Sequence, residues 1–189
     1  MIKNLILHLH TVNKHRWLVF KLCCKAGIPF RGLVHDLSKF SPTELFESAK
    51  YFKGDKSPIS YCKKDKGYSN AWLHHKANNK HHAQYWYDEL APQKAALIPY
   101  KYTVEMICDT LAAGMTYQKD KWTKDYQLNY YLNKEHRDIL NPIIDEILVD
   151  VYTKVSEEAL KVINHKQLKK IYYDHVRGDK NDQKHQNIS

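Results

Sequence analysis

The sequence predicts a single all-α domain, and three observations support this prediction. The chain has 189 residues, the usual size of one domain with its own core. Hydrophobic residues make up 43% of the chain, which is enough to build that core. Glycine and proline number six each, whereas a β-sandwich or barrel needs a turn about every ten residues. We expect the domain to cover residues 1–177, followed by a disordered polar tail over 178–189.

Apolar residues recur at helical spacing along most of the chain. This period is typical of amphipathic helices that pack one face on a core. It predicts five longer helices, over about residues 4–26, 72–90, 100–118, 134–155 and 157–173. The second of these can break at Asn78-Asn79, and the fourth contains Pro142.

Shorter elements are predicted between the first two of these helices. The sequence Gly27-Ile28-Pro29 ends the first helix, and another is expected over about 31–39. Ser41-Pro42 then indicates an N-cap with proline at the first helical position, and Glu44 completes a capping box. The segment 53–67 contains glycine, proline and a lysine cluster, so we expect it to be a loop.

Charge and cysteine content limit the class of protein. Lysine and arginine outnumber acidic residues by 30 to 21, giving a net charge of +9. A basic surface attracts phosphate-bearing partners in general, so it does not separate a nucleotide from a nucleic acid. The four cysteines form no CxxC pair, which argues against a disulfide framework. His8 and His10 interrupt the apolar N-terminal run, and no stretch reaches the length of a membrane span. We therefore expect a cytoplasmic protein with no membrane partner.

The pair His35-Asp36 is the first candidate for chemistry. Val34 precedes it and Leu37 follows it, so the pair is expected to lie where a helix enters the core. A buried aspartate must be paired or must bind a metal. On this motif alone, a structural hydrogen bond is the commoner explanation.

Histidines cluster a second time in the segment from His74-His75 to His81-His82. His75 and His82 are seven residues apart, which is two turns and hence one face of a continuous helix. Aromatic residues at 85–87 argue against a fully exposed helix. We prefer His75 to His74 as a ligand, while His81 and His82 stay unranked. Neutral imidazoles suit iron, zinc, manganese, nickel and copper.

Asp109 and His15 complete the candidate set. Asp109 follows Cys108 and precedes Leu111 in an apolar helix, so its carboxylate needs a partner. His15 lies midway along the first helix, where a single histidine is usually an ordinary core or surface residue. A helical bundle can project ligands from several helices to one point. The predicted metal ligands are His15, His35, Asp36, His75, His81, His82 and Asp109.

The order of these residues resembles the HD superfamily of metal-dependent phosphohydrolases. Its ligands are a histidine, an adjacent His-Asp pair and a later aspartate, with further histidines in between in the dinuclear branches. The stretch from His35 to Lys39 is similar to the His-Asp-x-Gly-Lys of many HD enzymes, with Ser38 in place of glycine. The segments 32–42, 79–86 and 105–109 also resemble an HD-like family of bacterial and phage proteins that has no settled function. The likeness covers roughly residues 10–130.

This resemblance implies an HD-domain-like helical bundle with a metal site in its core. It implies one or two divalent ions, which could be iron, manganese, cobalt, nickel or zinc. The spacing of 20 residues between His15 and His35 is shorter than in many HD enzymes. No Gly-Tyr-Pro motif follows the His-His pair, which disfavours hydrolysis of cyclic di-GMP.

The resemblance implies hydrolysis of a small phosphoester, such as a nucleotide, by metal-activated water. Asp36 would bridge two metals, and Lys39, one turn from His35, would stabilise phosphate charge. We expect Arg16 to be an ordinary surface residue. Two alternatives stay open: an HD-type di-iron oxygenase, and a non-catalytic regulatory protein that binds metal or nucleotide. Nucleic acid is a less favoured partner because no helix-turn-helix or zinc-finger spacing is present. The oligomeric state is not predicted.

Overall fold

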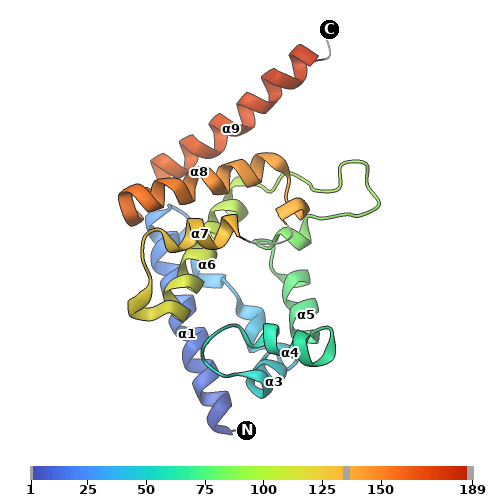
Figure 1. Ribbon diagram of the computed structural model, residues 1–189, viewed down its shortest axis with the longest axis vertical. Coiled ribbons are helices and arrows are strands. Elements are labelled where there is room, and N and C mark those ends of the chain that lie inside the picture. Colours follow the sequence, from blue (N-terminus) through green and yellow to red (C-terminus); the bar gives the residue numbers. More distant parts are fainter. Residues whose placement is uncertain (1, 134–136, 187–189) are drawn as a thin grey trace.

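Within residues 2–133 and 137–186, for which the backbone is described, the chain forms helices joined by turns and contains no strand. Side chains are described for residues 2–133 and 137–178. This computed structural model confirms the predicted all-α class (Figure 1). The helices are α1 Ile2–Lys25, α2 Pro29–Val34, α3 Pro42–Tyr51, α4 Pro58–Lys66, α5 Asn70–Asn78, α6 Tyr100–Gln118, α7 Tyr126–Leu132, α8 Pro142–Glu158 and α9 His165–Gln186. None of these described helices is long and apolar enough to cross a membrane.

Helix α6 lies at the centre of the arrangement (Figure 1). Helix α1 packs along one side of α6, and α2 packs on α1. Helices α4 and α5 both pack on α3 near the N-terminal end of α1, whereas α7 and α8 form a second group near its other end. Helix α9 packs on α8 and then extends away from the body of the molecule.

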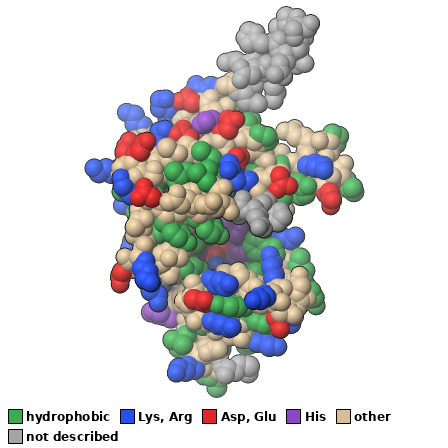
Figure 2. Space-filling view, in the orientation of Figure 1, with side chains coloured by type: hydrophobic (Ala, Val, Ile, Leu, Met, Phe, Trp, Pro, Cys, Tyr) green, Lys and Arg blue, Asp and Glu red, His purple; other side chains and the backbone are tan. Residues whose placement is uncertain are grey.

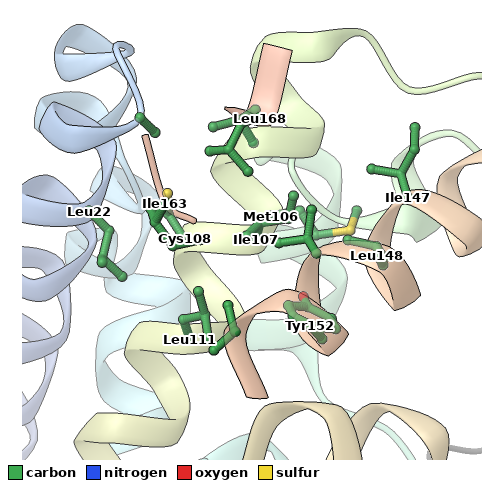
Figure 3. Close-up of a cluster of buried hydrophobic side chains, with 14 of the residues drawn as sticks. Leu22, Met106, Ile107, Cys108, Leu111, Ile147, Leu148, Tyr152, Ile163 and Leu168 are labelled. Carbon is green, nitrogen blue, oxygen red and sulfur yellow. The ribbon is translucent and has the colours of Figure 1, made fainter. Parts of the chain in front are cut away.

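The apolar core forms where α6 is covered by α1, α8 and the start of α9 (Figure 3). Leu111 of α6 is fully buried, as are Leu148 and Tyr152 of α8. Leu22 contributes from α1 and Leu168 from α9. Burying a side chain of this size contributes roughly 1.5–3 kcal/mol. Because packing on several sides fixes α6, any side chain that α6 projects toward the α3–α5 group has a defined position.

Gly32 allows α2 to lie close to α1. A Cβ atom at this position would be 2.7 Å from the Cβ of Cys23 and 2.9 Å from the Cα of Phe20. Distances below 3.0 Å are not tolerated without a shift, and one of these atoms belongs to the backbone of α1. The glycine therefore sets the position of α2 and of the His35-Asp36 turn that follows it.

Several predicted boundaries agree with the structure and others do not. Helix α6 spans the predicted residues 100–118, and the Ser41 side chain caps α3 by accepting from the backbone N–H of Glu44. The loop expected over 53–67 is wrong, because α4 occupies most of it. Pro58 stands in the first turn of α4 and Gly67, at φ 81°, ends it in the left-handed conformation.

The other differences concern helices that end early, one that begins late and one that was not predicted. The helix expected over 31–39 ends at Val34, and the one expected over 72–90 ends at Asn78, at the break that Asn78-Asn79 allowed for. The helix expected from 134 begins at Pro142, after the N-cap Asn141, and α7 was not predicted. Residues 134–136 lie outside the described part.

The C-terminal segment also differs from the expected boundaries. Helix α9 begins at His165 rather than 157, because a left-handed Ala159 (φ 56°) separates it from α8. It continues to Gln186, into the segment expected to be a tail. Residues 187–189 of that tail lie outside the described residues.

Candidate metal centre

The structure brings the seven predicted ligands together from four parts of the chain. They come from α1, the turn after α2, the region of α5 and the turn after it, and α6. Two groups of four could each hold a metal ion, with ligand atoms that all lie within 4.8 Å of one another. The first group is His15, His35, Asp36 and Asp109, and the second is Asp36, His75, His81 and His82. Asp36 belongs to both groups.

The first group has the spacing of ligands around one ion. Asp109 Oδ1 lies 2.9 Å from His15 Nε2 and 3.4 Å from His35 Nε2. Asp36 Oδ2 lies 3.3 Å from His35 Nε2 and 3.9 Å from His15 Nε2. Ligands about 2.1 Å from one metal are roughly 3.0–3.4 Å apart at octahedral or tetrahedral angles. The nitrogen and oxygen atoms are therefore close to coordination geometry.

The second group uses the other oxygen of the same carboxylate. Asp36 Oδ1 lies 3.4 Å from His75 Nε2 and 3.5 Å from His81 Nε2. The His82 ring centroid is 4.8 Å from that of His75 and 4.2 Å from that of His81. Because Oδ1 faces one group and Oδ2 the other, the Asp36 carboxylate has the position of a bridging ligand.

A break in the backbone places this carboxylate. Helix α2 ends at Val34, and Asp36 adopts a left-handed conformation with φ 54°. Aspartate is one of the few residues that adopt this conformation readily. Arg16 fixes the turn by donating from Nε to the His35 carbonyl at 2.8 Å and from Nη2 to the Leu33 carbonyl at 3.0 Å. Arg16 is thus a structural residue of the turn rather than the simple surface residue that was expected.

Glu105 supports one imidazole in each group. Its Oε1 accepts from His35 Nδ1 at 3.1 Å and lies 3.3 Å from His81 Nδ1. Its Oε2 accepts from Arg31 at 2.7 Å. A carboxylate behind a metal-binding histidine fixes the tautomer and leaves the other ring nitrogen for the metal. His35, His81 and Glu105 are also close enough to form a third cluster, but Glu105 faces the Nδ1 atoms and so lies behind the ligands.

Glu44 supports the second group in the same way. Its Oε2 accepts from His75 Nδ1 at 2.8 Å, and its Oε1 accepts from His74 Nδ1 at 2.7 Å. The sequence interpretation gave Glu44 to a capping box, but its carboxylate is turned toward α5. His74 therefore contacts Glu44 instead of the cluster, whereas both His81 and His82 face the cluster.

The sequence could also have indicated that Glu105 lies next to the cluster. It stands one helical turn before Asp109, on the same face of α6.

The comparisons place the chain in a family. A model described as a family of unknown function, DUF5662, matches residues 5–154. The chain belongs to this family. All seven ligands lie inside the matched segment, together with Glu44 and Glu105, whereas α9 lies outside it. No curated protein and no solved structure matches the chain. The resemblance to the HD superfamily stays a prediction.

Buried polar atoms show that the residues fit a cation. Among the described residues, six buried atoms of the cluster have no aligned hydrogen-bond partner. One is His81 Nδ1, which lies 3.3 Å from Glu105 Oε1, and the five that belong to the two ligand groups are His15 Nε2, His35 Nε2, Asp36 Oδ1, His81 Nε2 and His82 Nε2. Leaving one such group unsatisfied costs about 1–3 kcal/mol. Natural proteins rarely leave several at one point. A divalent cation bound between these atoms would satisfy them together.

The charges of the two carboxylates and of His82 agree with this fit, whereas His35 differs: burial lowers the pKa of His35, but Asp36 and Asp109 outweigh it and hold that pKa well above its ordinary value. Burial raises the pKa of Asp36, but His35 and Lys39 outweigh it and hold that pKa well below its ordinary value. Burial also raises the pKa of Asp109, yet His15 and His35 bring it well below the ordinary range. Burial lowers the pKa of His82, which favours the neutral form of its imidazole. Ionised carboxylates and neutral imidazoles are the forms that bind metals.

Lys39 lies at the edge of the cluster. Its Nζ is 2.6 Å from Asp36 Oδ2, and its side chain is 26% exposed. It lines a cavity of about 160 Å³ together with His15, Asp36, His75, His82 and Asp109. Burial lowers the pKa of Lys39, but the Asp36 carboxylate outweighs it and raises that pKa above its ordinary value. Lys39 is therefore a cation that contacts both the bridging carboxylate and the open space beside it.

A second, larger cavity reaches the cluster from the α7 side. It has a volume of about 460 Å³ and is lined by His81, His82 and Asp109 at the cluster. The two cavities share Trp72 and Tyr117 in their walls. Figure 2 shows a hollow in this face of the molecule with histidine side chains at its floor. Six of the seven predicted ligands, all except the fully buried His35, thus line a cavity that is open to a small molecule.

Proposed function

We propose that this protein is a dinuclear metal-dependent phosphohydrolase of the HD type, acting on a small phosphoester such as a nucleotide. The observation that supports this proposal best is the position of the Asp36 carboxylate between two ligand groups. A bridging carboxylate is the arrangement that keeps two metal ions close enough to act on one phosphate. The cavities beside it leave room for that phosphate.

In this proposal the two ligand groups would each hold one divalent ion. Bound there, the ions would polarise a phosphate oxygen and lower the pKa of a bound water. Hydrolysis would combine that water with a phosphoester, break the bond between phosphorus and the leaving oxygen, and release phosphate and an alcohol. The leaving oxygen would take the remaining proton.

The chain's own residues would hold and orient the reacting groups. Glu105 and Glu44 would keep the Nε2 atoms of three imidazoles directed at the cluster. Lys39 would place its ammonium beside the phosphate oxygens and stabilise the charge that develops on them. The contact of this ammonium with Asp36 and the place of Lys39 in the wall of the smaller cavity support this role.

The direct test is phosphate release from a panel of nucleotides and simple phosphoesters, with Mn²⁺, Co²⁺, Fe²⁺ and Mg²⁺ added separately to apo protein. We expect Asp36→Ala to abolish turnover because both ligand groups lose a member. Lys39→Ala should keep its metals and lower the rate by roughly 10²-fold, as expected for the loss of a few kcal/mol of transition-state stabilisation. Full activity of Asp36→Ala would contradict the proposal.

The ligand set also favours a second candidate, an HD-type di-iron oxygenase. Five of its seven members are histidines, and imidazole is a good ligand for iron. Oxygen consumption by the reduced iron form, with no phosphate release under any metal, would replace the first proposal with this one. Metal binding with neither activity would favour a non-catalytic regulatory protein.

A further inference from the structure

The larger cavity has a wall of aromatic and amide side chains. It lies between α6, α7 and the residues that follow α5, and the metal-binding residues His81, His82 and Asp109 form one part of it. Tyr126 and Tyr130 of α7 form another part, and their rings are nearly parallel, at 15° with centroids 6.0 Å apart. At about 460 Å³ the cavity is within the range of roughly 300–1,000 Å³ that is typical of small-molecule sites.

The wall of this cavity has almost no net charge away from the cluster. Among its described lining residues other than the metal ligands, Asp55 and Lys56 are charged, and their charges are opposite. Phosphate would therefore not be held at the tyrosine side of the cavity. That side suits the uncharged part of a substrate whose phosphate lies at the metal ligands.

Apart from the metal ligands, Gln127 has the buried polar atom without a partner among the described residues of this wall. It is 1% exposed, and its Oε1 has no hydrogen-bond partner among the described residues. Gln118, also in the wall, instead donates from Nε2 to the Tyr126 hydroxyl at 3.3 Å. A carboxamide carries a donor and an acceptor side by side. A buried one that lines a cavity is suited to a ligand with a complementary donor and acceptor edge.

We propose that this cavity is a nucleobase subsite, in which the ring of a nucleotide stacks beside Tyr130 and pairs its hydrogen-bonding edge with the Gln127 carboxamide. The proposal rests on the proposed function for the place of the phosphate, and it narrows the substrate class to nucleotides. Aromatic faces stack with any base, and the amide adds the preference for one base edge. A phosphoester without a planar ring would leave Gln127 unsatisfied.

Binding of nucleosides tests the subsite without any reaction. Adenosine, guanosine, cytidine and uridine are titrated into the full-length protein by calorimetry, with ribose 5-phosphate as the probe that has no base. We expect at least one nucleoside to bind. Gln127→Leu and Tyr130→Ala should each weaken this binding by about tenfold, the usual result of losing a buried hydrogen bond or a stacking partner.

Tyr68→Ala is the matched control, because Tyr68 is 53% exposed outside the cavity and Tyr130 is 54% exposed on its rim. The control should bind like the unaltered protein. If Gln127→Leu does not fold, as judged by its thermal melt, the exposed Tyr130 position still decides. The subsite is wrong if no nucleoside binds, or if Tyr130→Ala binds as well as Tyr68→Ala.

The outcomes separate the subsite from the proposed function. Nucleosides that bind to a protein with no phosphatase activity would keep the subsite and remove the hydrolase. Equal hydrolysis of ribose 5-phosphate and nucleotides, with no effect of Gln127→Leu or Tyr130→Ala, would keep the hydrolase and remove the subsite.

Discussion

Glu105→Gln gives the sharpest prediction about how the ligands are held. Glu105 contacts Nδ1 of His35 in the first group and of His81 in the second, at 3.1 and 3.3 Å. Burial raises the pKa of this carboxyl, but the two imidazoles outweigh it and bring that pKa to about 2, so Glu105 is ionised. Glutamine keeps the shape and one acceptor but removes the charge. Because one residue supports both groups, both metal sites should weaken together.

The expected magnitude follows from what carboxylates behind metal ligands usually contribute. Loss of such a residue lowers metal affinity by roughly 10–100-fold, and here the loss should appear in each of the two sites. Glu44→Gln is the matched variant, because Glu44 supports only His75 among the ligands. It should weaken the second site by a similar factor and leave the first unchanged. His74→Ala removes the other partner of Glu44 and should leave both sites nearly intact.

The assay is competition between the protein and a chelator of known affinity, followed by the metal content of the protein. A thermal melt of each apo variant shows whether the fold is kept. If Glu105→Gln binds two metals as tightly as the unaltered protein, Glu105 does not support the two groups. If Glu44→Gln weakens both sites equally, Glu44 does not act through His75 alone.

Three other predictions concern single positions. His15→Ala removes a ligand of the first group and should reduce the bound metal to about one ion per chain. His10 is exposed on the same helix, so His10→Ala should keep two ions, and elemental analysis of both variants measures the difference. Gly32→Ala places a Cβ 2.7 Å from a side chain of α1, so it should lower the free energy of unfolding by about 1–3 kcal/mol. Urea unfolding measures this value, and an unchanged free energy would contradict the close packing. Burial raises the pKa of Asp145, but hydrogen bonds from Arg137 outweigh it and lower that pKa, so ionised Asp145 stabilises the folded protein above about pH 4. This stabilisation is lost as the pH falls through the lowered pKa, so the free energy of unfolding of Asp145→Asn should fall less on acidification than that of the unaltered protein. Parallel pH profiles of the two proteins would contradict this prediction.

The sequence was sufficient to predict that these seven side chains come together, although each of them alone had an ordinary explanation. A buried aspartate needs a partner, and the order of the histidines and aspartates on separate predicted helices, which resembles the HD superfamily, indicated one common site. Helix α6 was predicted with its correct bounds because its apolar pattern is long and uninterrupted. These features are local, so a single sequence reveals them.

The features that the sequence did not predict depend on tertiary contacts. A continuous helix through Asp36 was expected, but Arg16 of α1 stabilises a left-handed turn there. The role of Glu44 as the support of His75 depends on α5 packing on α3, which no local pattern reports. Helix α4 carried proline and glycine boundary signals, yet its lysine-rich composition favoured a loop interpretation.

We propose that two metal ions lie on either side of the Asp36 carboxylate, and the proposed function depends on both. Anomalous X-ray scattering from crystals of the full chain soaked in Mn²⁺ tests it most directly. We predict two peaks within coordination distance of Asp36, one among His15, His35 and Asp109 and the other among the three histidines of the second group. The absence of any peak at Asp36, or a single peak on the Glu105 side of the imidazoles, would contradict the account.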